Sequence, residues 1–153
     1  YRKCPRLAEA RGSEILRGNK VFLRTAGGTF VSSTPKGNVV VSWPNCGKWE
    51  GMLLDTDSEA ALRSGDTVYL KVHTGKRITS VPKNGVVHGK WNHRASWQRL
   101  QIIKDGGGVV RAGDAVRLRT NTTQLWLFVA GKRVKGDGSR GGKTSLFVID
   151  KLA

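Results

Sequence analysis

The sequence predicts an all-β domain built from three repeats of four strands each. The same landmarks return in the same order with a period of about 48 residues, within the range typical of internal repeats. Each unit opens with a Gly-Asn or Gly-Asp pair, and two apolar residues with one residue between them follow. That spacing is the period of a half-buried strand rather than of a helix. A unit of this length cannot bury its own apolar face, so we expect the three copies to pack together.

Three segments carry the repeat, and together they form one domain over residues 15–153. They cover about residues 16–58, 62–106 and 110–152. Their opening pairs are Gly18-Asn19, Gly65-Asp66 and Gly113-Asp114. An aromatic residue or Ile recurs at a fixed step, at Phe30, Ile78 and Trp126. Residues 1–14 form a basic extension, either an ordered arm or a flexible tail, in which a helical turn is expected at 5–11.

Four strands are expected in each unit, joined by tight turns. They cover about residues 20–25, 29–33, 39–41 and 51–55 in the first unit, and 67–72, 77–81, 86–88 and 99–104 in the second. The turn between the second and third strands is the clearest. Pro35-Lys36-Gly37-Asn38 and Pro82-Lys83-Asn84-Gly85 place Pro ahead of residues that tolerate positive φ. This chemistry predicts a hairpin at each turn.

Length and composition fit a single β-rich domain. A chain of 153 residues can bury roughly 70% of the surface that its unfolded form exposes. Twenty Gly against four Pro, placed between short β-rich runs, indicate many tight turns. No apolar run approaches the about 20 residues that a bilayer requires, so no transmembrane segment is expected. Nothing in the sequence indicates a compartment or an oligomeric state.

Three units of four strands resemble the β-trefoil. In that fold the first and last strands of each unit build a six-stranded barrel, and the middle hairpins cap one end. The motif Gly-Asp-x-Val-x-Leu-(Arg/Lys), clearest at residues 65–71 and 113–119, is similar to the fascin-like and MIR branches of the superfamily. Residues 48–52, Lys-Trp-Glu-Gly-Met, resemble the fascin-like closing pattern, and Trp97-Gln98 and Thr144-Ser145 occupy the same place later in the chain.

The ricin-type lectin branch is a weaker resemblance. Its Gln-x-Trp motif belongs in the closing strand of each unit, whereas Gln124-Leu125-Trp126 falls in the second strand of the third unit. The trefoil resemblance implies an architecture and not one function, because the fold serves lectins, growth factors, actin cross-linkers and inhibitors.

Positive charge is the strongest functional signal in the composition. The chain has 27 Lys and Arg against 11 Asp and Glu, a formal net charge of +16. Residues 67–104 contain eight basic side chains and no acidic one, whereas acidic residues gather at the junctions between units. On the trefoil resemblance, the hairpin turns would form a positive cap. The predicted anion-binding residues are Lys36, Lys83, Lys132, Arg133, Lys135 and Arg140.

Such a charge exceeds the magnitude of about 2 to 8 that solubility alone suggests. The predicted partner is therefore an anionic macromolecule: a nucleic acid, a sulfated or otherwise acidic glycan, or an acidic protein surface. The alternative is solubilising charge that protects exposed turns from edge pairing.

Two pairs of Trp repeat with the units. Trp43 and Trp49 of the first unit are matched by Trp91 and Trp97 of the second. Trp49 and Trp97 precede the closing strands and are expected to be packed. Trp43 and Trp91 lie in loops, where they could stack on sugars or bases or fold back as lids on the barrel. The third unit has a Gly-rich basic loop at this place, so an aromatic site would be at most two-fold.

Cys4 and Cys46 are the candidate disulfide, with free or buried thiols as the alternative. Catalytic and metal chemistry find little support. The His residues, His73, His88 and His93, all lie in the second unit, and no neighbouring Cys or carboxylate completes a zinc shell. No Ser lies in a strained elbow. We predict no enzyme activity, no metal and no cofactor.

Three functions follow from these patterns. The leading hypothesis is a non-catalytic binding or scaffold module, including an accessory subunit of a larger assembly, that docks a basic surface on an anionic partner. The second is a lectin-like module that binds carbohydrate through Trp43 and Trp91. The third is a fascin-like actin-binding protein.

Overall fold

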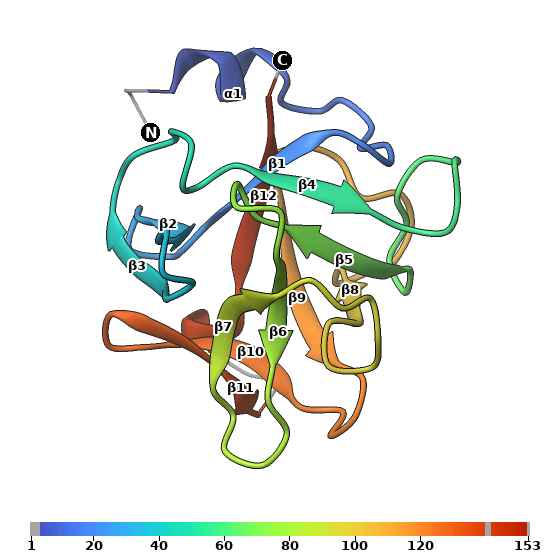
Figure 1. Ribbon diagram of the computed structural model, residues 1–153. Coiled ribbons are helices and arrows are strands. Elements are labelled where there is room, and N and C mark those ends of the chain that lie inside the picture. The colour runs from blue at the N-terminus through green and yellow to red at the C-terminus, as the bar shows by residue number, and fades with distance from the viewer. Residues whose placement is uncertain (1–3, 140–141, 153) are drawn as a thin grey trace.

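The computed structural model describes residues 4–139 and 142–152, and its regular structure is almost entirely β (Figure 1). The one α-helix is α1, Pro5–Glu9, which lies inside the helical turn expected at 5–11. The strands are β1 Lys20–Arg24, β2 Phe30–Ser33, β3 Val39–Trp43, β4 Met52–Asp55, β5 Thr67–Lys71, β6 Arg77–Ser80, β7 Val87–Trp91, β8 Leu100–Ile103, β9 Asp114–Thr120, β10 Trp126–Ala130, β11 Arg133–Gly138 and β12 Phe147–Lys151. A 3₁₀ turn, η1, covers Lys143–Ser145. The expected all-β class is confirmed.

Six of these strands close into a barrel. The antiparallel pairs β1–β4, β5–β8 and β9–β12 join the first and last strand of each unit. The pairs β4–β5, β8–β9 and β12–β1 join one unit to the next and complete the ring. A larger closed ring of nine strands runs through two hairpins, because β3 also pairs with β11 and β10 with β9. Closure leaves the six barrel strands without a free edge.

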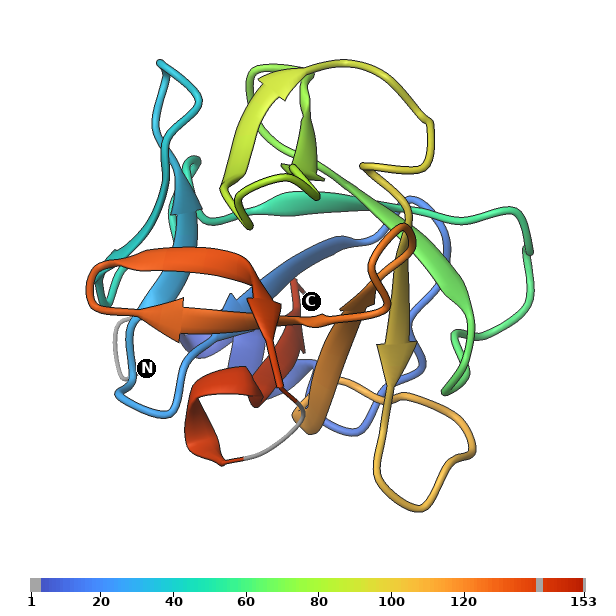
Figure 2. The ribbon, with the colours of Figure 1, turned by 90° about the horizontal axis from the view of Figure 1, so that it is seen from below.

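The three hairpins β2–β3, β6–β7 and β10–β11 interlock around the opposite end from α1 (Figures 1 and 2). Each hairpin turn accepts a backbone hydrogen bond from the outer strand of the next hairpin. The donor N–H groups are those of Gly89, Gly136 and Val41, and the acceptor carbonyls are those of Gly37, Gly85 and Lys132, at distances of 2.8, 2.8 and 2.9 Å. Each unit supplies one donor and one acceptor, at equivalent places in its hairpin. The hairpins therefore repeat the period of the sequence.

Glycine at two of these contacts allows the close approach. A Cβ on Gly89 would lie 2.8 Å from Ser33 Oγ. Gly37 has a φ of +88°, a left-handed conformation that favours Gly, and a Cβ there would lie 3.1 Å from the Gly89 carbonyl oxygen. The Gly of the predicted hairpin turn is therefore needed both for the turn and for the contact between hairpins.

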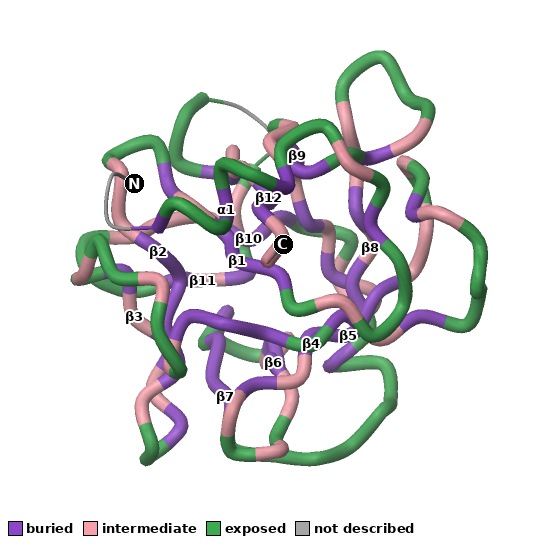
Figure 3. Tube along the Cα trace, turned by 90° about the horizontal axis from the view of Figure 1, so that it is seen from above, coloured by how far each residue is buried: buried purple, intermediate pink, exposed green. Residues whose placement is uncertain are grey.

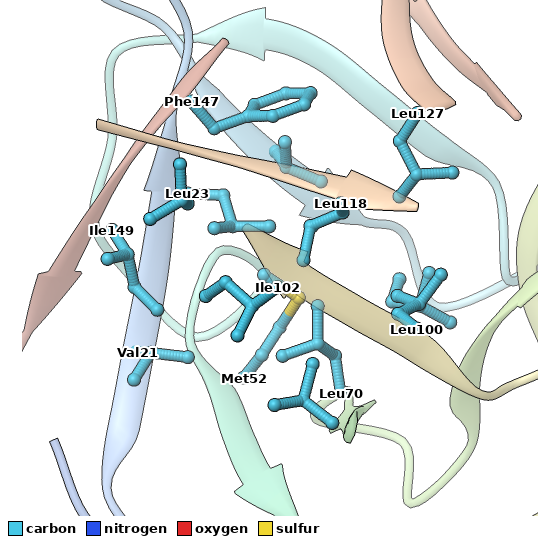
Figure 4. Close-up of a cluster of buried hydrophobic side chains, with 14 of the residues drawn as sticks. Val21, Leu23, Met52, Leu70, Leu100, Ile102, Leu118, Leu127, Phe147 and Ile149 are labelled. Carbon is cyan, nitrogen blue, oxygen red and sulfur yellow. The ribbon is translucent and has the colours of Figure 1, made fainter. Parts of the chain in front are cut away.

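Apolar side chains from all three units fill the barrel (Figure 4). The strands alternate as expected: in β4, Met52 and Leu54 are buried whereas Leu53 is 42% exposed. Seen from above, buried segments follow the strands and exposed segments follow the loops (Figure 3). Because each unit supplies only part of this cluster, no unit could bury it alone.

The N-terminal extension, called the leader from here on, contributes to a second, smaller apolar cluster beside the barrel. Leu7 of α1 and Cys4 pack with Phe22 and Phe30, and a disulfide joins Cys4 to Cys46. Residues 4–14 are therefore held against the domain. None of the described helices is long and apolar enough to cross a membrane.

One landmark of the repeat was misaligned. The ladder pairs the final Arg or Lys of the repeated motif, which is Arg24, Lys71 or Arg119, with Phe30, Arg77 and Trp126 in turn. Arg77 and not Ile78 therefore occupies the place of Phe30. Ile78 is instead buried in the core. A shift of one residue exchanges the two faces of a strand, and a fixed repeat step hides this shift.

Candidate functional site

The predicted cap cations lie on the interlocked hairpins. Lys36 and Lys83 occupy the first two hairpin turns and are exposed, as are Lys132 and Arg133 in the third hairpin. None of these four side chains forms an ion pair with a carboxylate within residues 4–139 and 142–152. Lys135 is half-buried on β11, and Arg140 lies outside the described residues.

The cap also contains a carboxylate. Asp137 on β11 packs against Gly85 of the second hairpin turn, and its Oδ2 lies 3.8 Å from Lys135 Nζ. It therefore lowers the positive potential at this point, and Lys135 is the weakest of the predicted cap cations that the structure describes.

The two Trp pairs differ in exposure. Trp43 and Trp49 are half-buried with ring centroids 5.6 Å apart, and the ring of His73 stacks on Trp49 at 6.4 Å. Trp91 and Trp97 lie 5.8 Å apart, and each is 39% exposed. The expectation that Trp97 is packed is therefore wrong, because among the described residues no ring covers it as His73 covers Trp49.

A cavity of about 330 Å³ opens beside the exposed pair. Its lining comes from Trp91, His93, Ala95, Ser96, Trp97 and Gln98. The turn below it is fixed by Gln98, whose amide donates to Thr79 Oγ1 at 3.0 Å and accepts from the backbone N–H of Ala95 at 3.1 Å. An apolar cavity with a few fixed polar groups is the usual form of a small-ligand site.

The first unit builds the same turn around a buried carboxylate. Glu50 accepts from Ser32 Oγ at 2.6 Å and from the backbone N–H of Gly47 at 2.8 Å. The Trp-Glu and Trp-Gln pairs noted in the sequence are therefore anchors for the closing turn.

The three His residues do not converge. His73 Nε2 lies 2.8 Å from the Ser33 carbonyl oxygen, and His93 lies near Trp91 with ring centroids 6.4 Å apart. His88 Nδ1 accepts from the backbone N–H of Lys90 at 3.0 Å. Burial lowers the pKa of His88 below its usual value, and the charge of Lys90 acts in the same direction. The described part of the chain holds no group of three or more His, Cys, Asp or Glu arranged to bind a metal.

One set of basic residues was not predicted from the sequence to form a site. The outer face of the barrel carries three equivalent rows of cross-strand neighbours, one at each seam between units. The rows are Lys20–Leu53–Lys71–Arg77, Thr67–Gln101–Arg119–Trp126 and Ala115–Val148–Arg24–Phe30. The third position is always basic, and it is the final (Arg/Lys) of the repeated motif. That invariant charge within the repeat was the available signal.

Two seams are open and cationic. Beside β4 and β5, a cavity of about 260 Å³ is lined by Lys20, Lys48, Lys71 and His73 among others. Beside β8 and β9, a cavity of about 200 Å³ contains Arg99 and Arg119. Of the described residues that line these two cavities, none is acidic.

At the third seam, a buried carboxylate of the domain itself neutralises the positive charge of Arg24. Arg24 Nε donates to Asp150 Oδ2 at 3.2 Å, and the Asp150 side chain is only 1% exposed. Burial raises the pKa of Asp150 above its usual value, although the hydrogen bond and the charge of Arg24 act in the opposite direction.

The acidic residues at the first junction are also paired. Arg94 donates to Asp55 at 2.9 Å and to Asp57 at 2.6 Å, and Arg77 lies 3.5 Å from Asp55. The hydrogen bond from Arg94, with its charge, lowers the pKa of Asp57. The negative potential expected at this junction is therefore reduced by Arg side chains of the second unit.

Comparison with known proteins identifies the fold. No protein-family model matches the chain, and no curated protein matches it in sequence. Among solved structures, the Saccharomyces cerevisiae protein O-mannosyltransferase Pmt1-Pmt2 complex bound to the sugar donor is similar with a TM-score of 0.74 and 16% identity. That match covers 90% of this chain and 25% of the other. The SDF2-like protein from Arabidopsis thaliana is also similar, with a TM-score of 0.74 and 16% identity over 89% of this chain and 94% of that one.

Both matches cover about nine-tenths of this chain, so the likeness extends over nearly the whole fold. The chain spans a quarter of the mannosyltransferase chain that it matches. At this identity the likeness defines an architecture and not an activity.

Proposed function

We propose that this chain is a non-catalytic binding module with a MIR-like β-trefoil fold, which docks its cationic surface on an anionic macromolecule. The observation that carries the proposal is the distribution of ion pairs. At least seven of the 11 acidic residues already pair with Lys or Arg inside the domain. They are Asp55, Asp57, Glu59, Asp105, Asp114, Asp137 and Asp150. The charge excess therefore lies on exposed cations without a partner carboxylate among the described residues, including Lys36, Lys83 and Lys132.

The strand pairing supports the trefoil part of the proposal. Six barrel strands and three interlocked hairpins repeat with the period of the sequence, as a trefoil requires. The Cys4–Cys46 disulfide favours an oxidising compartment, because such bonds are rare where thiols are kept reduced.

Salt dependence tests the proposal. Binding to immobilised heparin should weaken by about tenfold or more between about 50 mM and about 200 mM salt, because each neutralised anion releases a counterion. The triple substitution Lys36→Gln, Lys83→Gln, Lys132→Gln should reduce both the affinity and the salt slope. Affinity that stays constant across this range would exclude docking by charge.

A lectin-like module is the second candidate, favoured by the cavity beside Trp91 and Trp97. Aromatic faces in a cavity can stack on sugar rings. Trp43 is a poorer candidate than Trp91, because it and its partner Trp49 are half-buried. Trp91→Ala should abolish binding of neutral glycans, measured at about 200 mM salt to suppress charge effects. A blank glycan array for the unmodified chain would remove this candidate. The described structure adds no observation that favours actin binding, which co-sedimentation tests.

A further inference from the structure

The cavity between β8 and β9 combines cations with neutral polar groups. Its volume is about 200 Å³, and it lies on the outer face of the barrel at the seam between the second and third units. Arg99 and Arg119 contribute guanidinium groups, and Thr67, Gln101, Asn121 and Gln124 contribute hydroxyl and amide groups. A site with two fixed positive charges and several neutral hydrogen-bonding groups suits a ligand that is both anionic and rich in hydroxyls.

Arg119 is held in place but is not neutralised. Its terminal nitrogen donates to the side-chain oxygen of Gln101, and its guanidinium lies over the Trp126 ring at 5.5 Å. Its Nε is buried and has no hydrogen-bond partner among the described residues. A guanidinium carries five N–H donors, so terminal donors beyond the one bonded to Gln101 remain for a bound anion.

The equivalent Arg of the first unit has the partner that Arg119 lacks. Arg24 pairs with the buried carboxylate of Asp150. In the strand ladder the place of Asp150 is taken by Ile103, because Asp150 faces Phe22 and Ile103 faces the equivalent residue Arg117. The repeat therefore preserves the cation at this seam and replaces its internal anion with an apolar side chain.

Arg99 supplies the second charge from the exposed rim. Its Nε donates to the Tyr69 hydroxyl at 2.9 Å, which orients the guanidinium beside the cavity. The planar forks of two Arg residues match the oxygens of a carboxylate or sulfate group better than two Lys would.

The wall of the cavity also contains backbone strain. Gln124 has a φ of 59° and is the one non-Gly residue with positive φ in the described part of the chain. Its amide donates to the Asn121 carbonyl at 2.7 Å, which holds the loop in this conformation. Residues kept in such sparsely populated regions concentrate at ligand sites.

We propose that this cavity binds an acidic sugar residue, carboxylated or sulfated, within a glycan chain. The anionic group lies between Arg99 and Arg119, and the sugar hydroxyls bond to Gln101, Asn121 and Thr67. The inference rests on the proposed docking function and names its ligand class. A glycan fits better than a nucleic acid because the residues that line the cavity are mostly polar and include no aromatic ring for base stacking, and because the disulfide favours an oxidising compartment.

Isothermal titration with short ligands tests the inference on the full chain. The probes are a sulfated heparin tetrasaccharide, a hyaluronan tetrasaccharide that carries carboxylates alone, and oligothymidylate of equal charge. We expect the chain to bind at least one of the two acidic tetrasaccharides more tightly than oligothymidylate, and the tighter of the two identifies the anionic group. Arg119→Gln and Arg99→Gln should each weaken that binding about tenfold, the value of one lost charge-assisted hydrogen bond.

Arg63→Gln is the matched control, because it removes one charge from an exposed residue that does not line the cavity. It should leave tetrasaccharide binding unchanged. Arg99→Gln keeps the test valid if Arg119→Gln fails to fold, since Arg99 is exposed, and thermal melting reports the folding of each variant.

The outcomes separate this inference from the docking function. If Arg99→Gln and Arg63→Gln reduce tetrasaccharide binding equally, the assignment of the acidic sugar to this cavity is overturned. Tighter binding of oligothymidylate than of either tetrasaccharide would overturn it as well. If long heparin still binds in a salt-dependent way in either case, the docking function stands. No binding of any polyanion at low salt would overturn both.

Discussion

At the seam between β12 and β1, Arg24 forms an ion pair with Asp150, whose side chain is buried. At the seam between β8 and β9, the equivalent Arg119 bonds to a neutral amide, and Ile103 occupies the place of the carboxylate. The two seams share strand register and the basic residue. One of their differences is at the place of Asp150, which Ile103 takes at the second seam. The first, closed seam therefore keeps an internal ion pair, whereas the second, open seam has a polar cavity.

The leader adds a second difference between the two seams, because it covers only the closed one. Beside the closed seam, Phe22 and Phe30 pack with Leu7 of α1 and with Cys4, and the disulfide to Cys46 fixes this cover. At the open seam, Arg117 and Trp126 take the places of Phe22 and Phe30. An internal repeat therefore identifies which positions are equivalent, whereas neighbouring elements decide which copy remains available to a ligand.

The largest expected effect is on the cover of the closed seam. The disulfide spans 42 residues, and replacing Cys4 and Cys46 with Ser should lower the free energy of unfolding by about 3 to 4 kcal/mol through the entropy of the unfolded chain. Chemical denaturation measures the loss. Tetrasaccharide affinity at the open seam should not change, and a parallel loss of affinity in folded protein would show that the two seams are not independent.

Arg24→Gln should lower the free energy of unfolding by about 3 kcal/mol at neutral pH, because it leaves the buried Asp150 carboxylate without its cation. Arg119→Gln should cost about 1 kcal/mol or less, because Arg119 contributes a contact with Trp126 and no carboxylate depends on it. Equal losses in the two variants, measured by chemical denaturation, would contradict the assignment of the two seams.

The deficit of Arg24→Gln should depend on pH. Burial raises the pKa of Asp150, so the folded state holds its proton to higher pH than the unfolded state. The contribution of Asp150 to the free energy of unfolding is therefore fully present below its pKa in the unfolded state. This contribution is lost as the pH rises through its pKa in the folded state. Without Arg24 the folded pKa rises further, and the deficit should shrink as the solution is acidified towards pH about 4. Denaturation midpoints at several pH values give the trend, and a deficit that grows on acidification would reverse the assignment.

Ile103→Asp should convert the open seam into a copy of the closed one. The new carboxylate would neutralise Arg119 as Asp150 neutralises Arg24, and it would repel an anionic sugar, so tetrasaccharide affinity should fall about tenfold. Ile103→Asn has similar size and polarity without the charge, and it should retain affinity in the same titration. Equal effects of Asp and Asn would mean that the site does not respond to charge at this position.

The smallest expected effect concerns His88, which lies on β7 beside Trp91. His88 accepts a backbone hydrogen bond beside Trp91, and its pKa is lowered by burial. Its stabilising contribution is present above its unfolded pKa and is lost as the pH falls below that value. His88→Gln should flatten the decline in melting temperature between pH about 7 and pH about 5. An unchanged slope would show that another group titrates there.

Much of the architecture could be predicted from the sequence. The repeat period, the Gly-rich turns and the alternating apolar pairs indicated an all-β chain with three units, and the strand boundaries in the first unit agree within two residues. The single-residue offset at Arg77 was missed, because a fixed repeat step cannot detect where a strand gains or loses one residue. Trp97 was expected to be packed, but its exposure depends on loop neighbours that the repeat does not specify.

The surface proposed to bind anions could only partly be predicted from the sequence. The hairpin cations Lys36 and Lys83 were identified because hairpin turns are local in sequence. Arg119 was visible only as the last letter of a motif, because its neighbours Gln101 and Trp126 come from different strands. The position of Asp137 against Gly85 joins two hairpins, and such a contact between units cannot be predicted from the repeat.

The sequence by itself determined the period, the class of fold and the excess of positive charge, since these depend on local patterns and composition. The tertiary structure alone decided which charges remain available. Ion pairs such as Arg24–Asp150 and Arg94–Asp55 join residues 126 and 39 positions apart. Coulomb energy depends on distance in space and on burial, and only the closure of the barrel sets these two quantities.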